Sequence, residues 1–130
     1  MYHCHISFYL IGSQSNIFET VRKMSPLEHF THSFAESERP EAALLAQADV
    51  ILADVQGMDA GTALLPLAGG MKPGAELIVL ADKEQIPALA EVGSAVKDIW
   101  VMPIAEEEVR FRFLRWQQGY KQGKDYWQAN

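Results

Sequence analysis

Asp54 is the residue of this 130-residue chain whose position is best suited to chemistry. It follows an apolar run, Val50 to Ala53, whose lack of polar alternation is typical of a strand covered by helices on both faces. Ligands and reactive groups in open α/β sheets gather at the carboxyl ends of such strands. A helix is predicted soon afterwards, over Thr62 to Ala68. Asp54 is therefore the first candidate site residue.

The histidines and the cysteine near the start of the chain form a second candidate site. His3 and His5 flank Cys4, and strand alternation would place both imidazoles on one face, a spacing that suits zinc. Structural zinc sites need four ligands, and the remaining histidines, His29 and His32, lie on another segment. We therefore expect neither a metal site nor a cofactor. No G-x-G-x-x-G or P-loop pattern predicts a nucleotide site.

Five apolar segments alternating with helical patterns must position these residues. Strands are predicted at His5–Ile11, Phe30–Phe34, Val50–Ala53, Glu76–Ala81 and Ile99–Met102. Helix starts are predicted at the capping pairs Asn16 with Glu19 and Asp82 with Gln85, and near Pro40, Thr62 and Glu106. The second strand alternates polar and apolar residues, so it is expected at an edge of the sheet. Right-handed crossovers then favour a doubly wound parallel α/β sheet.

The segment around Asp54 resembles the central strand of response-regulator receiver domains. In that family an Asp at the strand end accepts a phosphoryl group, and a Met, an acidic residue and a Gly follow in the loop. Asp54, Met58, Asp59 and Gly61 match this pattern, although the usual Pro is absent. The resemblance covers most of the chain, to about Trp116. It implies a flavodoxin-like sheet of five strands in the order 2-1-3-4-5.

The other positions that receiver phosphotransfer uses are degenerate in this chain. The family's acidic pair after the first strand, which helps to hold magnesium, corresponds to Gly12 and Ser13. Its hydroxyl residue at the end of the fourth strand corresponds to Ala81, and its Lys before a Pro corresponds to Met102 before Pro103. Magnesium relies on carboxylate oxygens, and phosphoryl transfer depends on positioning and charge stabilisation. The sequence therefore predicts a pseudo-receiver that is not an enzyme, with the strand-end aspartate as a vestigial phosphoacceptor position.

Composition and charge limit the partners of the chain. One cysteine excludes an internal disulfide and no secretory pattern precedes it, so a reducing cytoplasm is the expected compartment. No apolar run approaches the ~20 residues of a membrane span. The net charge is −6 and cations cluster only at Arg110, Arg112 and Arg115, which argues against contact with nucleic acid. Protein partners or a covalently linked output domain are expected instead.

The last predicted helix carries apolar and aromatic residues at helical spacing: Val109, Phe113, Trp116, Tyr120 and, more weakly, Trp127. The first three are expected to pack on the sheet. Farther along, the helix is expected to leave the body of the domain, where its aromatic side chains would lack cover. Trp116, Tyr120 and Trp127 are therefore the candidates for a weak homodimer interface.

These patterns divide the chain into a receiver-like domain, residues 1–116, and a C-terminal helical extension or linker to an output domain, residues 117–130. The leading interpretation is a non-catalytic pseudo-receiver module of two-component signal transduction that acts through domain contacts. It would be the N-terminal regulatory part of a larger protein, such as a diguanylate cyclase or a sensor kinase. Two alternatives stay open: a phosphorylatable response regulator with an atypical site at Asp54, and a small-ligand-binding α/β domain that uses the strand-end crevice.

Overall fold

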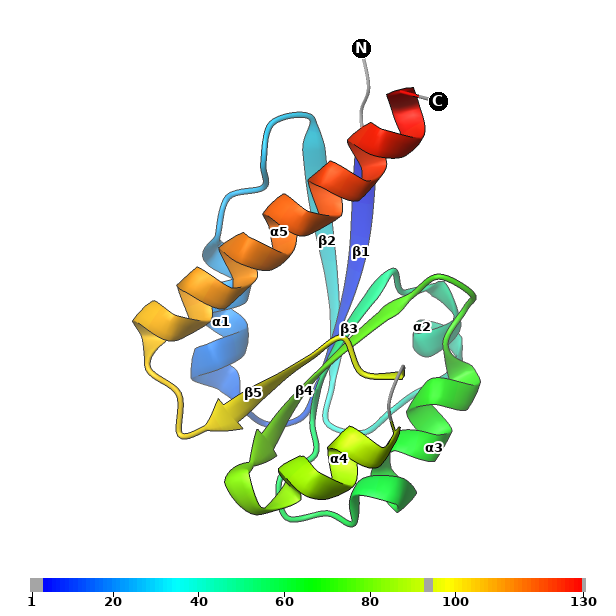
Figure 1. The fold of residues 1–130 in the computed structure, drawn as a ribbon, viewed down its shortest axis with the longest axis vertical. Coiled ribbons are helices and arrows are strands. Elements are labelled where there is room, and N and C mark those ends of the chain that lie inside the picture. Colours follow the sequence, from blue (N-terminus) through cyan, green and yellow to red (C-terminus); the bar gives the residue numbers. More distant parts are fainter. Residues whose placement is uncertain (1–3, 93–94, 130) are drawn as a thin grey trace.

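One parallel sheet organises the chain, as predicted. The computed structural model describes residues 4–92 and 95–129, without the side chains of Val92 and residues 123–129. Its strands are β1 Cys4–Ile11, β2 Phe30–Ser37, β3 Val50–Asp54, β4 Glu76–Asp82 and β5 Asp98–Met102. They lie in the order β2-β1-β3-β4-β5, all parallel, so the doubly wound flavodoxin-like α/β fold is confirmed (Figure 1).

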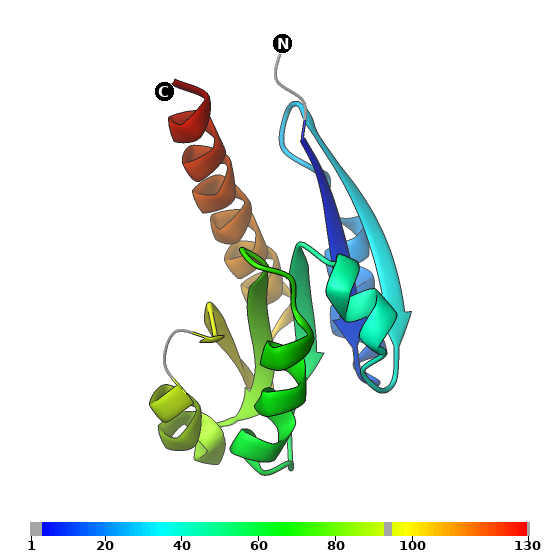
Figure 2. The same cartoon turned by 90° about the vertical axis from the view of Figure 1, so that its right-hand side faces the viewer.

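Helices cover both faces of the sheet. They are α1 Ser15–Lys23, α2 Ala42–Gln47, α3 Ala60–Gly70, α4 Ile86–Val92 after the short 3-10 turn η1 Lys83–Gln85, and α5 Glu106–Ala129. Helices α1 and α5 pack on one face and α2, α3 and α4 on the other (Figure 2). Within the described residues, no helix combines the length and the apolarity that crossing a membrane requires.

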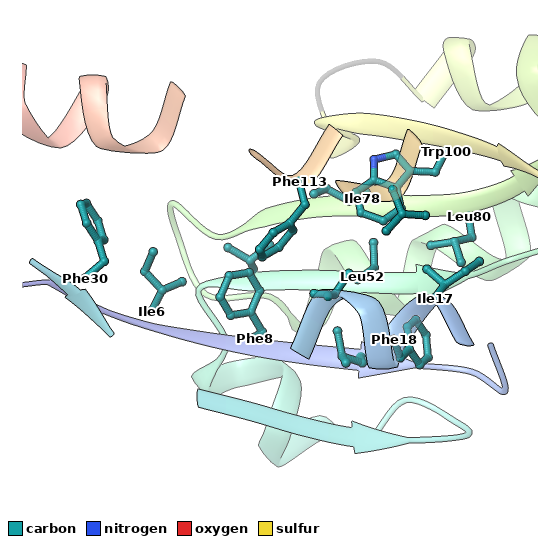
Figure 3. Close-up of a cluster of buried hydrophobic side chains, with 14 residues drawn as sticks. Ile6, Phe8, Ile17, Phe18, Phe30, Leu52, Ile78, Leu80, Trp100 and Phe113 are labelled. Carbon is teal, nitrogen blue, oxygen red and sulfur yellow. The ribbon is translucent and has the colours of Figure 1, made fainter. Parts of the chain in front are cut away.

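Two hydrophobic cores result, because successive strand residues point to opposite faces. Phe8 and Leu10 of β1 belong to the core under α1 and α5, whereas Tyr9 and Ile11 belong to the core under α2 to α4. The first core contains the fully buried Trp100, close to side chains of β3, β4 and α5 (Figure 3). The continuous apolar runs of the central strands follow from this double cover.

The two predicted capping boxes have different outcomes. The box of Asp82 and Gln85 is present: the backbone N–H of Asp82 donates to Gln85 Oε1 at 2.7 Å. The box of Asn16 and Glu19 is wrong, since the N-cap of α1 is Gln14 and Asn16 already lies inside the helix. Glu19 instead forms an ion pair with Lys23, one turn later.

Strands β1 and β2 extend beyond the rest of the sheet. They pair over eight residues, from Cys4 with Phe30 to Ile11 with Ser37, whereas β3 pairs with β1 only from Phe8 onwards. The first halves of both strands thus form a two-stranded ribbon, here called the β1–β2 ribbon (residues 4–7 and 30–33). Helix α5 runs past the sheet alongside this ribbon (Figures 1 and 2).

Candidate functional site

Asp54 lies at the carboxyl edge of the sheet, in the middle of the strand order. It is the last residue of β3 and pairs with Leu80 of β4, while the preceding residue, Ala53, pairs with Ile11 of β1. The loops that follow β1, β3 and β4 therefore meet around its half-buried carboxylate. This is the crevice where doubly wound folds carry their sites.

Two glutamine side chains hold the carboxylate of Asp54. Gln14 Nε2 donates to Asp54 Oδ2 at 3.0 Å, and the backbone N–H and the Nε2 of Gln56 both donate to Oδ1 at 3.0 Å. We call Gln14 and Gln56 the amide clamp. Neutral N–H donors replace the water that a carboxylate loses on burial, so the clamp compensates Asp54 without a cation. No sequence pattern singled out either glutamine, beyond its place soon after a predicted strand.

The positions that match the family's acidic pair provide no metal ligand. Gly12 has a φ of +130°, and a Cβ added to it would lie 2.7 Å from Asp54 Cβ. A carboxylate side chain at this position therefore requires the backbone to move. Ser13 is exposed, and its carbonyl accepts the N–H of Ser15.

The other two degenerate positions are apolar and belong to the hydrophobic cores. Ala81 is fully buried in the core under α2 to α4. Met102, at the end of β5 and followed by Pro103, is half-buried and packs against the core under α1 and α5. Neither side chain offers a hydroxyl or a cation to a phosphoryl group at the strand ends.

The loop after Asp54 is tied to the end of β4. Asp82 Oδ2 accepts the N–H of Gly57 at 3.0 Å, and Gln85 Nε2 donates to the carbonyls of Val55 at 2.6 Å and Met58 at 2.8 Å. Asp82 and Gln85 thus fix the loop as well as the start of η1, a second role that the capping pattern did not predict. Asp82 is therefore a structural residue of this loop, because its Oδ2 accepts the hydrogen bond from Gly57.

A cleft opens beside Asp54, between the β2–α2 turn and α3. Its volume is ≈ 320 Å³. We call it the strand-end cleft. Its lining comprises Ile11, Glu38, Arg39, Pro40, Ala53, Asp54, Val55, Met58, Asp59, Thr62, Ala63, Pro66 and Leu67.

The strand-end cleft is separate from the groove between α1 and α5, whose volume is ≈ 460 Å³. The floor of the strand-end cleft is formed by the ends of β1 and β3, and one wall by α3. Most of its lining is apolar, and its charged groups lie at the turn after β2 and around Asp54. The cleft therefore has the shape and the composition of a small-molecule site at a strand-end crevice.

The predicted histidine pair does not gather into a metal site. His5 is exposed and its ring nitrogens contact the hydroxyls of Thr31 at 2.7 Å and Ser33 at 2.9 Å. His32 lies among the aromatic rings of the core under α1 and α5, and burial lowers its pKa from 6.5 to about 4, with a smaller effect of His5. His3 lies outside the described residues. Among the residues that are described, no group of three or more His, Cys, Asp or Glu side chains could hold a metal ion.

Trp116 packs against the core under α1 and α5, as expected of this part of the helix, whereas the expectation that Tyr120 lacks cover is wrong. The ring of Trp116 lies 5.4 Å from that of Phe8, and its indole N–H donates to Glu76 Oε2 at 2.7 Å. Tyr120 contacts Trp116 at 5.1 Å and Phe30 of the β1–β2 ribbon at 6.4 Å, between ring centroids. The ribbon supplies the cover that the helix pattern alone did not predict. The side chain of Trp127 lies outside the described residues.

The body of the domain continues past the predicted boundary at residue 116. Gln117 is only 4% exposed, and its Nε2 lies 3.5 Å from the carbonyl of Ser25. Together with Tyr120, it attaches the next turn of α5 to the loop before β2 and to the β1–β2 ribbon. The segment that was predicted as a linker thus begins as a packed part of the fold.

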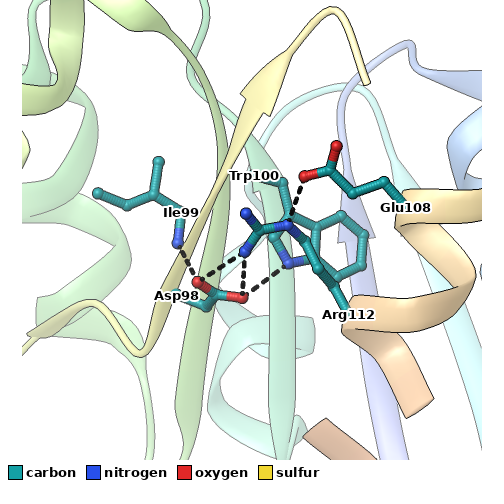
Figure 4. Close-up of polar contacts among 5 residues, drawn as sticks. All are labelled: Asp98, Ile99, Trp100, Glu108 and Arg112. Atoms are coloured by element: carbon teal, nitrogen blue, oxygen red, sulfur yellow. Dashed lines mark hydrogen bonds and ion pairs between the residues drawn. The ribbon is translucent and has the colours of Figure 1, made fainter. Parts of the chain in front are cut away.

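Polar contacts fix the first half of α5 against β5. Arg112 donates to Glu108 at 2.8 Å and lies 3.4 Å from both carboxylate oxygens of Asp98, which also accepts the indole N–H of Trp100 at 3.0 Å (Figure 4). The hydrogen bond to Glu108 raises the pKa of Arg112. Arg110 pairs with Glu106 at 2.8 Å. Arg110 and Arg112, two of the three clustered arginines, are therefore engaged within the domain.

Comparisons with known proteins identify the fold. No protein-family profile and no curated protein matches the sequence. The receiver domain of AraT, a response regulator from Geobacillus stearothermophilus, is similar in structure, with a TM-score of 0.65 and 18% identity over 92% of this chain and 98% of that one. A putative CpaE2 pilus assembly protein from Sinorhizobium meliloti has a TM-score of 0.61 and 15% identity over 83% of this chain and 99% of that one.

A third similar structure is a CheY-like response regulator from Mesorhizobium loti, with a TM-score of 0.56 and 14% identity over 87% of this chain and 98% of that one. All three matches span nearly the whole of the other chain, so they concern a complete domain and not a shared fragment. At these identities the likeness establishes the fold. The chain therefore has the fold of CheY-like response-regulator receiver domains, as its resemblance to them predicted.

Proposed function

We propose that this chain is a pseudo-receiver: a signalling domain with the receiver fold that does not accept a phosphoryl group and acts through protein contacts. In this proposal it is not an enzyme, works in the cytoplasm, and is the N-terminal regulatory part of a larger signal-transduction protein. The observation that carries the proposal is the amide clamp, because Gln14 and Gln56 donate hydrogen bonds to both oxygens of Asp54, the residue at the phosphoacceptor position.

The geometry around the clamp supports the loss of metal binding. Magnesium in proteins needs several hard oxygen ligands at short distances. Here Gln14 presents N–H donors toward Asp54 Oδ2, a side chain at Gly12 would collide with Asp54, and Asp82 is engaged by Gly57. A cation that approached Asp54 would meet amide hydrogens and would have to displace them.

The means of stabilising a transferred phosphoryl group are missing as well. Catalysis of this reaction depends on cations and hydrogen-bond donors aimed at the phosphoryl oxygens. Ala81 and Met102 contribute only apolar surface, and both are packed in the hydrophobic cores. The alternative of a phosphorylatable regulator would need donors and a metal from outside this set of residues.

Exposed apolar side chains support a role in protein contacts. Phe111 of α5 is 62% exposed, and Leu114, three residues later on the same helix, is 39% exposed. Contiguous exposed apolar surface often marks interaction sites, whereas single exposed apolar side chains are common. One of the similar structures is named as a putative pilus assembly protein, so the fold also occurs outside proteins that are named as response regulators.

Intact-mass spectrometry after incubation with magnesium and acetyl phosphate tests the proposal. We expect no stoichiometric gain of one phosphoryl group, because the metal ligands and the stabilising cation are missing. A phosphorylatable receiver domain treated in parallel shows that the donor is active. A full gain of one phosphoryl group that disappears in Asp54→Asn would refute the pseudo-receiver.

Binding of Mn²⁺ provides an independent check of the same site. Paramagnetic Mn²⁺ broadens the amide signals of residues that surround a bound metal, so a receiver-type site would lose the signals near Asp54 first. We expect uniform weak broadening over the acidic surface of the protein. Selective loss of the Asp54 and Gln56 signals at low Mn²⁺ concentration would contradict the argument from the clamp.

A further inference from the structure

The strand-end cleft is a preformed hollow with a rigid rim. Tyr9 Oη donates to the carbonyl of Arg39 at 3.3 Å and accepts the backbone N–H of Glu41 at 3.0 Å, so a buried side chain of β1 holds the turn after β2. Ser37 Oγ donates to the same carbonyl at 2.6 Å. On the opposite side, the N-cap bonds from Thr62 to Asp59 fix the start of α3.

The side of the strand-end cleft that α3 and the loop before it form is apolar. Met58, Ala63, Pro66 and Leu67 line it from the α3 side, and helix α3 carries no charged side chain along its whole length, Ala60–Gly70. Met58 is 55% exposed, and its flexible thioether side chain is well suited to cover an apolar group of a ligand. The volume of ≈ 320 Å³ is at the lower end of the roughly 300–1,000 Å³ of small-molecule sites. The cleft therefore suits a small ligand with an apolar body.

The charged groups of the lining differ in what they already bind. Asp59 Oδ2 accepts two bonds from Thr62, which leaves Asp59 Oδ1 outside these bonds, and Asp54 Oδ1 accepts two from Gln56. Asp54 Oδ2 accepts one bond, from Gln14, and keeps a lone pair. Within the described part of the chain, no hydrogen bond or ion pair engages the guanidinium of Arg39 or the carboxylate of Glu38, although both line the cleft. The cleft thus offers a ligand one cation, Arg39, and acceptor oxygens of Asp54, Glu38 and Asp59.

We propose that the strand-end cleft binds a small zwitterion with an apolar body, of the chemical class of an α-amino acid with an apolar side chain. Its carboxylate pairs with Arg39, its ammonium group is accepted by Asp54 Oδ2 or Glu38, and its side chain lies on Met58 and α3. An anion without an ammonium group would face three carboxylates, whereas a cation without a carboxylate would leave Arg39 unpaired.

The inference goes beyond the pseudo-receiver role, because binding in the cleft uses neither a metal ion nor a phosphoryl group. It gives Asp54 a role that the amide clamp permits, since the clamp leaves the Oδ2 lone pair unused. The two proposals can fail separately. Absence of amino-acid binding would not change the mass-spectrometry result, and phosphorylation of Asp54 would not change the result of the binding experiment below.

Titration of the isotope-labelled chain by NMR tests the proposal. Leucine, methionine and phenylalanine are added separately, and 3-methylbutylamine and 4-methylpentanoate serve as analogues of leucine that lack the carboxylate or the ammonium group. We expect at least one of the amino acids to shift the amide signals of Arg39, Asp54 and Thr62 in a saturable manner. Each analogue should bind about tenfold more weakly or worse, because it loses one charge-assisted contact.

Variants separate the cleft from the rest of the surface. Arg39→Ala should weaken binding about tenfold or more, and Ala63→Leu should abolish it by filling the cleft. Arg115→Ala removes an exposed arginine of α5 outside the cleft and should leave binding unchanged. The signals of distant core residues such as Trp100 show that each variant is folded.

Three results would overturn the proposal. The first is the absence of a saturable shift with all three amino acids. The second is a saturable shift at residues away from the cleft, or binding that Arg39→Ala and Ala63→Leu leave intact. The third is equally tight binding of 3-methylbutylamine or 4-methylpentanoate, which would show that the cleft does not recognise a zwitterion.

Discussion

Replacement of Gly12 by alanine tests the close approach of β1 and β3 at the site. Gly12 has a φ of +130°, which L residues rarely adopt, and an added Cβ would lie 2.7 Å from Asp54 Cβ. The backbone conformation costs about 1–3 kcal/mol, and the overpacking costs about 1–3 kcal/mol more. We therefore expect Gly12→Ala to lower the free energy of unfolding by about 2–6 kcal/mol.

Urea denaturation followed by circular dichroism measures this change, and the chain offers a matched control. Gly69 lies in α3 with nothing within 4 Å of an added Cβ. Gly69→Ala should raise stability by about 0.5–1 kcal/mol, because alanine favours the helix and restricts the unfolded chain. Both substitutions add one methyl group, so the difference between their effects on the free energy of unfolding reports the local geometry at Gly12.

A double-mutant cycle separates the two contributions. In the Asp54→Gly variant the Cβ that would collide is absent. Adding Gly12→Ala to this variant should then lower the free energy of unfolding only through the unfavourable φ. This loss should be about 1–3 kcal/mol smaller than the loss that Gly12→Ala causes in the wild-type chain. A loss of less than about 1 kcal/mol for Gly12→Ala alone would refute the reasoning. Equal costs in both backgrounds would show that the contact with Asp54 contributes nothing.

Three further predictions follow from contacts around the site and along α5. Asp54→Asn should destabilise the domain by about 1–2 kcal/mol in urea denaturation, because the new amide group turns an N–H toward either Gln14 or Gln56; no change would contradict the amide clamp. The pKa of His32 is lowered to about 4 by burial, so its neutral form stabilises the fold above about pH 6.5 and this stability should be lost as pH falls toward 4. His32→Phe should flatten that pH profile, and an identical profile would exclude His32 as the cause. Removing residues 117–130 should lower stability by about 2–4 kcal/mol, because Gln117 and Tyr120 pack on the body; a truncated chain of unchanged stability would restore the boundary at residue 116.

The pattern of apolar residues was sufficient to predict a doubly wound parallel sheet, whereas the strand order came from the resemblance to receiver domains. Continuous apolar runs such as Val50–Ala53 indicated strands covered on both faces, and the alternation in Phe30–Phe34 indicated an edge strand, which is where β2 lies. These signals are local, because a strand or a helix must place its own apolar residues toward the core. The degenerate positions of the receiver site could also be read from residue types, since no conformation makes a ligand of an alanine.

The spacing of capping residues was a weaker signal, because its meaning depends on where the preceding element ends. Asp82 ends β4 in an extended conformation, so its side chain and Gln85 can close the capping box. Asn16 has the same spacing to Glu19, but the chain enters α1 two residues earlier, at Gln14. The same pattern therefore gave one correct helix start and one wrong one.

The residues that define the site depend on the tertiary structure. Gln56 lies two residues after Asp54, so its contact is local, whereas only the pairing of β1 with β3 brings the amide of Gln14 to the same carboxylate. Trp116 and Tyr120 are covered in the same way, by Phe8 of β1 and Phe30 of β2, which lie far from α5 in the sequence. Sequence alone determined which residues must be buried and which reactive groups are missing, because these follow from side-chain chemistry and local periodicity. The tertiary structure decided which side chains meet, because contacts between distant segments depend on strand register and on the lengths of the elements that pack against each other.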